Sequence, residues 1–421
     1  MKKIDIAILG LGTVGGGTYQ VIEREREQIA KKEGFELNVK KVLALDYSVP
    51  IPDEKKAKDI EEIVGDPDIK IVVELIGGKT VAKKFILAAL KAGKTVVSAN
   101  KELIANCWQE LQDAAMETGA GFYFEASVGG GIPILRSVQE SLQANTIRSL
   151  SAIINGTTNY ILTNMEDNGS DFDVVLKEAQ QLGYAEADPT SDIEAFDSMY
   201  KLSILSSLAF GVHIPIDHIH REGITRITGL DMQLAHELGM TIKLLAIAKK
   251  DGDTVEARVH PTMIPLSHPL ANVKGVFNSI FMNGSAVGDV MFYGRGAGDF
   301  PTASAVVSDI IYAVNAEGKH KYAPYIGKDD PNVIFNTNWT SSYYLRFSVA
   351  DKPGVLSAIT GIMGKYNVGI ASVIQKGTGS DAVPLIFVTY DTKEEDMNAA
   401  LKEICLLDAV NEVSSCIRVE A

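Results

Sequence analysis

The first third of the chain contains short apolar runs separated by amphipathic stretches. Residues 4–9 form an apolar run of the length that is typical of a buried strand. Similar runs recur, with helical stretches such as 82–92 between them, at 39–45, 71–75, 95–97 and 122–124. Strands that alternate with helices predict a parallel, doubly wound sheet, so the fold class of this part is α/β.

The middle of the chain mixes strand and helix patterns. Residues 151–154 predict a strand, and an apolar helix is expected over 160–165. A second helix is expected to begin near Ser191 or Asp192 and to be buried, because residues 202–210 are strongly apolar. A helix of small residues over 302–314, which returns to the first sheet, is also predicted.

The C-terminal segment has the order strand, helix, strand, strand, helix, strand. The predicted elements cover 343–350, 355–363, 370–375, 382–390, 394–407 and 413–419. This βαββαβ order predicts a ferredoxin-like unit. Residues 318–338, which are rich in Lys, Asp, Pro and Asn, are interpreted as a linker before it.

Composition excludes several classes of protein. The chain has 421 residues with 40 Lys and Arg against 54 Asp and Glu, a formal charge of −14, so a nucleic-acid partner is not expected. Its 3 cysteines form no C-x-x-C pair, which argues against a disulfide framework and a cysteine zinc site. No apolar run reaches the ~18 residues of a bilayer span, so no membrane partner and a cytoplasmic location are expected.

A glycine-rich loop follows the first strand at once. Residues 10–15 read Gly-Leu-Gly-Thr-Val-Gly between a strand and a helix, as a dinucleotide fingerprint requires. The alternative is a glycine turn without a ligand. Asp46 ends the second strand, where an acid can accept from ribose hydroxyls and favour NAD, although a turn aspartate is the alternative. Asp46 lies further from Gly15 than the usual spacing, so the intervening segment must be long.

A later loop and a glycine-rich segment also carry candidate chemistry. Lys101 stands at the carboxyl end of a strand, where it would face the nicotinamide end of the crevice, although a surface lysine is the alternative. The segment 125–134 contains Glu125 and three consecutive glycines. It can hold a cation through carbonyl groups and Glu125, or it can be a plain hinge.

The segment 183–201 holds a cluster of acids and one lysine. Asp197 and Lys201 are four residues apart and share a helix face. A buried lysine beside acids can be a usable proton donor, and a structural ion pair is the alternative. The nearby acids Glu186 and Asp192 favour a polar substrate site. In the preceding motif 155–159, Thr157 or Thr158 is expected to cap a helix.

These motifs together resemble homoserine dehydrogenase with a C-terminal ACT domain, over nearly the whole chain. The resemblance rests on Gly-Leu-Gly-Thr-Val-Gly, Ala-Asn-Lys at 99–101, Glu-Ala-Ser-Val-Gly-Gly-Gly-Ile-Pro at 125–133, Asn-Gly-Thr-Thr-Asn at 155–159, Gly-Tyr-x-Glu-x-Asp-Pro-x-x-Asp at 183–192, Gly-x-Gly-Ala-Gly at 294–298, and Asp-Lys-Pro-Gly-Val-Leu at 351–356. It implies the reversible interconversion of L-aspartate 4-semialdehyde and L-homoserine with NAD or NADP, in the biosynthesis of threonine, methionine and isoleucine.

The resemblance also implies roles for single residues. Lys201 is the implied proton donor, assisted by Lys101 and Asp197, and the implied substrate contacts are Glu186, Asp192, Gly156 and Thr157. A sodium or potassium ion would be held by Glu125, Val128, Gly130 and Ile132. The implied cofactor contacts are Gly10, Gly12, Thr13, Val14, Gly15, Asp46, Ile76, Gly77, Ser98, Lys101 and Gly298. An effector such as threonine would contact Asp351, Gly354, Leu356 and Asn367; an ACT domain used only for assembly is the alternative.

The expected organisation follows from both lines of reasoning. Residues 1–130 with the returning helix 302–318 are expected to form a Rossmann-type NAD(P)-binding domain. Residues 131–301 are expected to form an α+β substrate-binding and dimerisation domain, followed by a linker at 319–342 and a ferredoxin-like ACT domain at 343–421. A homodimer or homotetramer is expected. A related dehydrogenase for another small aldehyde, or a non-catalytic amino-acid sensor, are the competing hypotheses.

Two departures from the family pattern bear on these expectations. Many members carry an arginine near the end of the second strand, but the residues here are Ala44, Leu45 and Asp46. This departure favours NAD, although Lys40 and Lys41 are nearby. The second departure is Ala195, which stands where the family often has glycine, and little consequence is expected from it.

Overall fold

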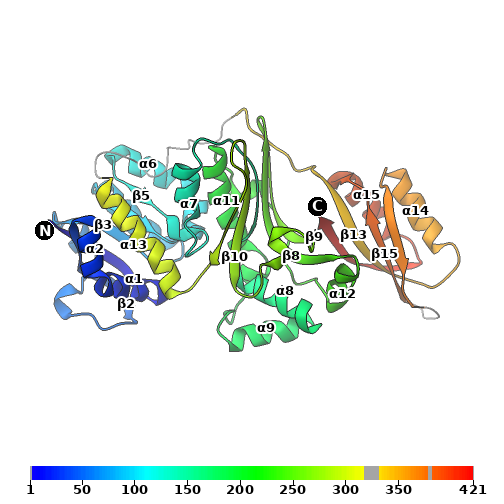
Figure 1. Cartoon of the computed structure of the whole chain (residues 1–421), viewed down its shortest axis with the longest axis horizontal. Coiled ribbons are helices and arrows are strands. Elements are labelled where there is room, and N and C mark those ends of the chain that lie inside the picture. The colour runs from blue at the N-terminus through cyan, green and yellow to red at the C-terminus, as the bar shows by residue number, and fades with distance from the viewer. Residues whose placement is uncertain (1, 317–330, 378–381, 421) are drawn as a thin grey trace.

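The molecule is elongated, with three units in sequence along its long axis (Figure 1). The structure is a computed structural model that describes residues 2–316, 331–377 and 382–420. An N-terminal parallel sheet with helices lies at one end, a central sheet follows, and the C-terminal strands and helices lie at the other end.

The N-terminal sheet has 5 strands in the order β2-β1-β3-β4-β5, and all of its pairings are parallel. The predicted α/β sheet is therefore confirmed. Its central strands are apolar because both faces are covered; Ile6, Ile8 and Val73 are fully buried. The elements are β1 (Lys2–Leu11), α1 (Thr13–Arg24), α2 (Arg26–Glu33), β2 (Phe35–Tyr47), η1 (Asp53–Lys55), α3 (Ile60–Val64), β3 (Ile69–Glu74), α4 (Thr80–Lys91), β4 (Thr95–Ser98), α5 (Lys101–Asn106), α6 (Trp108–Thr118) and β5 (Phe122–Tyr123).

Two features of this unit follow the sequence pattern. The long spacing between Gly15 and Asp46 arises because a second helix, α2, stands between α1 and β2. The returning helix is α13 (Asp299–Asn315), which lies alongside α1 in Figure 1. The two helices approach closely, since a Cβ on Gly17 would lie 2.9 Å from the carbonyl oxygen of Asp299.

The central unit is built on strands in the order β11-β10-β6-β8-β9. Helix α11 is buried along nearly its whole length beneath this sheet, as its apolar sequence predicts. The elements are η2 (Glu125–Ser127), α7 (Ile134–Arg136), η3 (Ser137–Ser141), β6 (Ile147–Ile153), α8 (Gly156–Asn168), α9 (Phe172–Gln181), α10 (Thr190–Ile193), α11 (Phe196–Phe210), η4 (Ile216–His218), β7 (His220–Arg221), α12 (Gly229–Glu237), β8 (Met240–Asp251), β9 (Thr254–Pro265), η5 (Pro269–Asn272), β10 (Phe277–Gly284) and β11 (Gly288–Arg295).

The C-terminal unit has the strand order β17-β13-β15-β14, which is the ferredoxin-like arrangement that the βαββαβ pattern predicts. Its sheet is continuous with the central sheet, because β17 pairs in parallel with β9. The sequence did not predict this junction. The elements are β13 (Thr340–Val349), α14 (Val355–Lys365), β14 (Ile370–Gln375), β15 (Val383–Thr389), β16 (Thr392–Lys393), α15 (Glu394–Ile404) and β17 (Val410–Val419).

Buried charged groups fix this junction. The carboxylate of Asp231, at the start of α12, is fully buried and accepts from Arg346 Nε at 2.8 Å and from the Tyr344 hydroxyl at 3.0 Å. Arg346 and Tyr344 belong to β13 of the C-terminal unit. Because a buried charge is costly unless it is paired, these contacts tie the two units together at a defined position.

Three local expectations need correction. Asn155, and neither Thr157 nor Thr158, caps α8, since its side chain accepts from the Thr158 N–H. The helix expected to run on from Ser191 or Asp192 is divided into α10 and α11, with Ala195 between them. The predicted linker 319–342 lies partly outside the described residues, and its described end contains β12 (Ile334–Phe335), which pairs with β9, and the start of β13.

None of the helices within residues 2–316, 331–377 and 382–420 combines the length and the hydropathy that a membrane span needs.

Candidate functional site

The glycine-rich loop between β1 and α1 is shaped to approach a ligand. Gly10 has a φ of +87°, and a Cβ on Gly15 would lie 2.1 Å from the carbonyl oxygen of Gly10, so strand and helix pack too closely for a side chain there. A Cβ on Gly12 would meet nothing within 4 Å. No side chain caps the N-terminus of α1. The loop therefore offers open space beside a helix N-terminus, which fits the pyrophosphate of a dinucleotide.

A buried carboxylate, Glu74, organises the neighbouring loops. It accepts from the N–H groups of Ile76 and Gly77 at 2.8 and 3.2 Å, and from the Ser98 hydroxyl at 2.7 Å. Burial raises the pKa of Glu74, against these hydrogen bonds. Ser98, predicted as a cofactor contact, is fully buried and uses its side chain on Glu74. Sequence reasoning did not identify Glu74.

The predicted cofactor residues meet residues of the central unit across a cavity. Val14, Ile76, Gly77 and Lys101 line a space of about 270 Å³, together with Ser191 and Tyr200 of the central unit. Gly298 begins α13, whose Asp299 lies against Gly17 of α1. The structure thus brings the predicted loops to the carboxyl edge of the sheet, where ligands of such folds bind.

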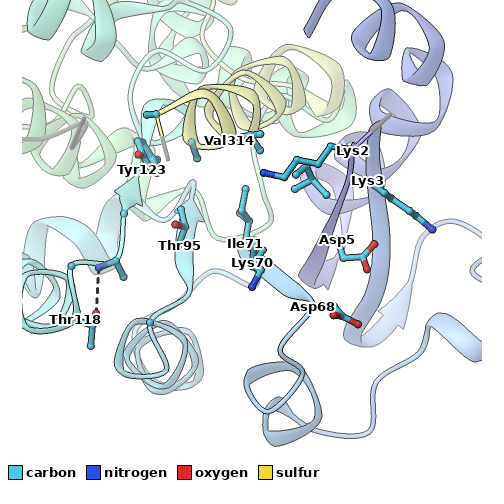
Figure 2. A pocket seen from close by; sticks show the side chains of 17 residues that line it. Lys2, Lys3, Asp5, Asp68, Lys70, Ile71, Thr95, Thr118, Tyr123 and Val314 are labelled. Atoms are coloured by element: carbon cyan, nitrogen blue, oxygen red, sulfur yellow. Dashed lines mark hydrogen bonds between the residues drawn. The ribbon is translucent and has the colours of Figure 1, made fainter. Parts of the chain in front are cut away.

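A cavity larger than this one lies at the opposite edge of the same sheet. The volume of this cavity is about 630 Å³. Its lining, shown in Figure 2, includes Lys2 of β1, Lys70 of β3, Thr95 of β4 and Tyr123 of β5. These residues stand at or near the amino ends of the strands. The glycine-rich loop and the candidate catalytic lysines are not among its lining residues, so we do not assign the chemistry to this cavity.

Two lysines from different units meet at one aspartate. The carboxylate of Asp197, on α11, lies 2.6 Å from Lys201 Nζ and 3.3 Å from Lys101 Nζ. Lys201 also donates to the carbonyl of Ile154 at 2.8 Å. Burial alone would raise the pKa of Asp197, but the charges on Lys201 and Lys101 hold that pKa well below its usual range. The charge on Asp197 in turn raises the pKa of Lys101.

Asn155 joins this group to a second carboxylate. Its amide nitrogen donates to Asp192 at 2.7 Å and to Asp197 at 2.9 Å, while its amide oxygen accepts from the Thr158 N–H at 2.9 Å. Burial, followed by the charge on Asp197, raises the pKa of Asp192. Asn155 belongs to the motif 155–159, and the sequence pattern assigns it no role. The signal that marks it is a polar residue between a buried strand and a helix, which is the position of an N-cap.

Ala195 separates α10 from α11 and has a left-handed backbone, with φ at 63° and ψ at 21°. A residue with a Cβ adopts this conformation at a cost of roughly 1 kcal/mol. Glycine would remove that cost, and the expectation that alanine has little consequence here stays a prediction. The backbone strain lies between two of the site's acids, Asp192 and Asp197.

The other predicted substrate residues are Gly156, Thr157 and Glu186, and they differ in how closely they contact the rest of the chain. Gly156 is the first residue of α8, and a Cβ there would lie 2.9 Å from the carbonyl oxygen of Val276. The Thr157 hydroxyl donates to the carbonyl of Tyr184 at 2.6 Å, which fixes the loop that carries Glu186. Glu186 itself is exposed.

Glu125, one of the predicted cation residues, belongs to a buried cluster of charged groups. The Glu125 carboxylate accepts from the N–H groups of Leu135 and Arg136 at 2.9 and 2.7 Å. Asp309, on α13, is fully buried, pairs with Arg136 at 2.7 Å and accepts from the Glu125 N–H at 2.8 Å. Burial and the Glu125 charge raise the pKa of Asp309 to about 7. The Asp309 carboxylate thus pairs with the Arg136 guanidinium, while backbone N–H groups hold the Glu125 carboxylate.

The remaining predicted cation residues belong to one glycine loop. Gly130 lies against the 295–297 loop, where a Cβ would be 2.3 Å from the carbonyl oxygen of Gly296. Val128 and Ile132 are buried, and the carbonyl of Ile132 accepts from the Ile134 N–H at 2.8 Å. Among the residues that the structure describes, no group of three or more His, Cys, Asp and Glu side chains could hold a metal ion.

The carboxyl end of β2 carries Asp46 next to Leu45, which is fully exposed. The two nearby lysines are both engaged elsewhere. Lys40 Nζ lies 2.8 Å from Asp66 and 2.9 Å from Asp68, and hydrogen bonds to these carboxylates raise the pKa of Lys40. Lys41 Nζ lies 2.5 Å from Glu62.

The predicted effector residues do not form one cluster within this chain. Asp351, Gly354 and Leu356 lie around the start of α14, and all are exposed. Asn367 follows the other end of that helix and has a φ of 57°.

The comparisons with known proteins agree along the chain. Residues 10–125, 133–311 and 343–405 match the family models described as the NAD-binding domain of homoserine dehydrogenase, homoserine dehydrogenase and the ACT domain. A homoserine dehydrogenase of Neisseria gonorrhoeae is 42% identical, over 100% of this chain and 99% of its own. The crystal structure of a homoserine dehydrogenase from Thiobacillus denitrificans is 41% identical with a TM-score of 0.92, over 100% and 99% of the two chains. A homoserine dehydrogenase structure from S. aureus is 32% identical with a TM-score of 0.77, over 100% of both chains.

The contact between Lys101 and Asp197 leads to a prediction about the protonation of Lys101. In Asp197→Asn the neighbouring negative charge is lost, so the pKa of Lys101 falls and its neutral amine appears at lower pH. Acylation of Lys101, followed by peptide mass spectrometry across a pH series, measures this change. The exposed Asp173→Asn on α9 is the matched control and keeps the wild-type profile. Identical profiles in all three proteins would contradict the assignment.

Proposed function

This chain belongs to the homoserine dehydrogenase family, and on that premise we propose that it interconverts L-aspartate 4-semialdehyde and L-homoserine with Lys201 as the proton donor. The observation that supports this role most directly is the meeting of Lys201 and Lys101 at Asp197, beside the cavity of the glycine-rich loops. An isolated structural ion pair would not need a second lysine from the N-terminal unit.

The residues divide the chemistry between them. An ammonium has three N–H donors, and Lys201 uses two of them on Asp197 and the carbonyl of Ile154. The third is assigned to the carbonyl oxygen of the aldehyde, where negative charge develops and a proton is taken up. Lys101 stands between the cavity and Asp197 and assists in orientation. A reduced nicotinamide, when bound, supplies the hydride.

The acids of the loop 183–192 are assigned to the amino group of the substrate. Asp192 is held by Asn155, and Glu186 is presented by the loop that Thr157 fixes. Carboxylates beside an ammonium form charge-assisted hydrogen bonds, which favour an amino-acid aldehyde over a simple aldehyde. Gly156 and Thr157 place the start of α8 against the same substrate.

Two further features remain proposals of the same kind. A sodium or potassium ion would be held by Glu125 and the carbonyls of Val128, Gly130 and Ile132, where two carboxyl groups, those of Glu125 and Asp309, are buried close together. Assembly into a homodimer or homotetramer is supported by exposed apolar side chains on an edge strand, Met291 and Tyr293 of β11.

The first experiment measures turnover of L-homoserine by the wild type and by Lys201→Ala. We expect the variant to lose about three orders of magnitude in kcat, in the range that positioned proton transfer contributes, while it still binds the dinucleotide. Quenching of cofactor fluorescence measures that binding. Lys84→Ala, an exposed lysine of α4, is the matched control and retains activity. Near-normal turnover of Lys201→Ala would remove Lys201 from the mechanism, and an inactive wild type that binds amino acids would favour the sensor hypothesis.

The second proposal concerns the cofactor: we propose a preference for NAD over NADP. Asp46 would accept from the ribose hydroxyls, Leu45 offers no charge to a 2′-phosphate, and Lys40 and Lys41 are already paired with acids. Gly10, Gly12, Thr13, Val14 and Gly15 would hold the pyrophosphate, with Ile76, Gly77, Ser98 and Gly298 forming the surrounding loops.

A double substitution tests this preference. Leu45→Arg with Asp46→Ala is expected to shift the ratio of kcat/KM for NADP over NAD by about tenfold or more, because it supplies a charged hydrogen bond and removes a repelling carboxylate. Leu45→Gln with Asp46→Ala has a similar size without the charge and separates the two effects. An unchanged ratio in the arginine variant would show that this end of β2 does not contact the ribose.

The C-terminal unit is proposed to bind a regulatory amino acid such as threonine at Asp351, Gly354 and Leu356, with Asn367 supplied across an interface between copies. Its support is the exposed loop at the start of α14, where Gly354 has a φ of +92°.

Initial rates with and without millimolar L-threonine test this proposal. We expect the wild type to be inhibited and Gly354→Val to lose the inhibition with its basal kcat retained, because valine is strained at a positive φ. Gly361→Val, on the exposed face of the same helix, is the control for a general effect on α14. Wild-type rates that are indifferent to threonine would reject threonine as the effector and support a role in assembly.

A further inference from the structure

The strained segment around Ala195 is held by a second stretch of chain, residues 220–224. The Ile224 N–H donates to the carbonyl of Ile193 at 2.9 Å. Gly223 lies so close that a Cβ there would be 2.4 Å from the same carbonyl oxygen. Residues 220–224 therefore contact the backbone immediately before Ala195.

Arg221 contacts the residues on both sides of Ala195. Its guanidinium donates to the carbonyl of Glu194, and its Nη1 lies 3.9 Å from the Glu194 carboxylate. The same guanidinium lies 3.6 Å from the ring centroid of Phe196, a cation–π contact. The Arg221 side chain thus contacts the carbonyl of the residue before Ala195 and the ring of the residue after it.

The backbone that Arg221 holds carries two acids of the site. The Ala195 N–H donates to the carbonyl of Asp192 at 2.9 Å, and Asp197 lies two residues further along. Both carboxylates bind the amide of Asn155. A rotation at Ala195 would therefore change the position of Asp192 relative to Asp197.

The same segment reaches the C-terminal unit. Its first residues form β7, which pairs with β9, and the Glu222 N–H donates to the carbonyl of Val259 at 2.8 Å. The Glu222 carboxylate lies 2.9 Å from Nη1 of Arg418 on β17. Arg418 in turn pairs with Glu394 of α15.

Open space borders this contact. A cleft of about 530 Å³ lies between the two units, lined by Glu194, Glu222 and Thr225 of the central unit and by Leu401 and Ser414 of the C-terminal unit. Because one side of the segment faces this cleft, the polar contacts of Arg221 and Glu222 add to the close packing of Gly223 and Ile224 in holding it there.

We propose that Arg221 is a positioning residue for the reaction: it holds Ala195 in the left-handed conformation that places Asp192 and Asp197, and the Glu222–Arg418 ion pair lets the C-terminal unit act on the same two carboxylates. This inference rests on the proposed function, in which Asp192 binds the substrate ammonium and Asp197 orders Lys201.

Arg221→Met and Arg221→Lys test the positioning role. We expect Arg221→Met to raise KM for homoserine about threefold to tenfold, with a smaller fall in kcat and unchanged affinity for the dinucleotide. Arg221→Lys keeps a donor for the Glu194 carbonyl and is expected to recover part of the loss. Adding Ala195→Gly to Arg221→Met is expected to recover it further, because glycine adopts a positive φ without a Cβ penalty. A lower melting temperature with an unchanged KM would overturn the proposal.

A matched pair of substitutions tests the link to the C-terminal unit. Glu222→Gln removes the charge opposite Arg418, and Glu237→Gln removes the charge opposite Lys376, an ion pair at 2.7 Å between the same two units but away from residues 220–224. We expect only Glu222→Gln to raise KM for homoserine, and the double variant Glu222→Gln with Arg221→Met to be no worse than Arg221→Met alone. An unchanged KM in Glu222→Gln, or fully additive effects, would overturn the link.

The wild-type assay separates the two levels of inference. An inactive wild type would reject the proposed function and this inference with it. An active wild type whose variants keep their KM would reject only the role of Arg221 and Glu222.

Discussion

Asp197 is 5% exposed, and its carboxylate is in contact with two ammonium groups that reach it from different units of the molecule. Burying the charges of Asp197 and Lys201 is costly in free energy, and mutual attraction offsets that cost only when the geometry is good and the remaining hydrogen bonds are made. The carbonyl of Ile154 and the amide of Asn155 supply those bonds. The carboxylate of Asp197 therefore constrains the position of α11 relative to the N-terminal sheet. Lys101, which contacts this carboxylate, also lines the cavity beside the glycine-rich loops.

The C-terminal unit is also connected directly to the central unit. Its strand β17 extends the central sheet at β9, and Asp231 is fully buried against Arg346. A motion of this unit cannot leave β9 unaffected, because the strands exchange backbone hydrogen bonds. Since β7 also pairs with β9, the C-terminal unit and residues 220–224, which contact the backbone between Asp192 and Asp197, share one strand.

What the sequence predicts well is what depends on neighbours along the chain. The glycine-rich loop, the pair Asp197 and Lys201 on one helix face, and the βαββαβ order all follow from local spacing, and the structure contains them. The contacts that the sequence does not reveal join distant segments. Glu74 under the loops, Asn155 between two aspartates, and Arg221 on Glu194 are each single polar residues without a repeating pattern, and only the fold brings their partners to them. The left-handed Ala195 is similar, because alanine gives no local sign of a positive φ.

On the proposed function, the charges of the site let one set of residues bind both the ammonium and the aldehyde of a single substrate. Lys101 and Lys201 carry two positive charges and Asp197 one negative charge, so the group next to the reacting carbonyl stays cationic and favours a developing alkoxide. Asp192 has a raised pKa because it is buried near Asp197. On the proposed function, the ammonium of the bound substrate lies beside Asp192 and favours its ionised form. When the substrate binds, Asp192 therefore becomes negatively charged beside an ammonium that neutralises it. The positive charge of Lys101 and Lys201 around the carbonyl oxygen is preserved.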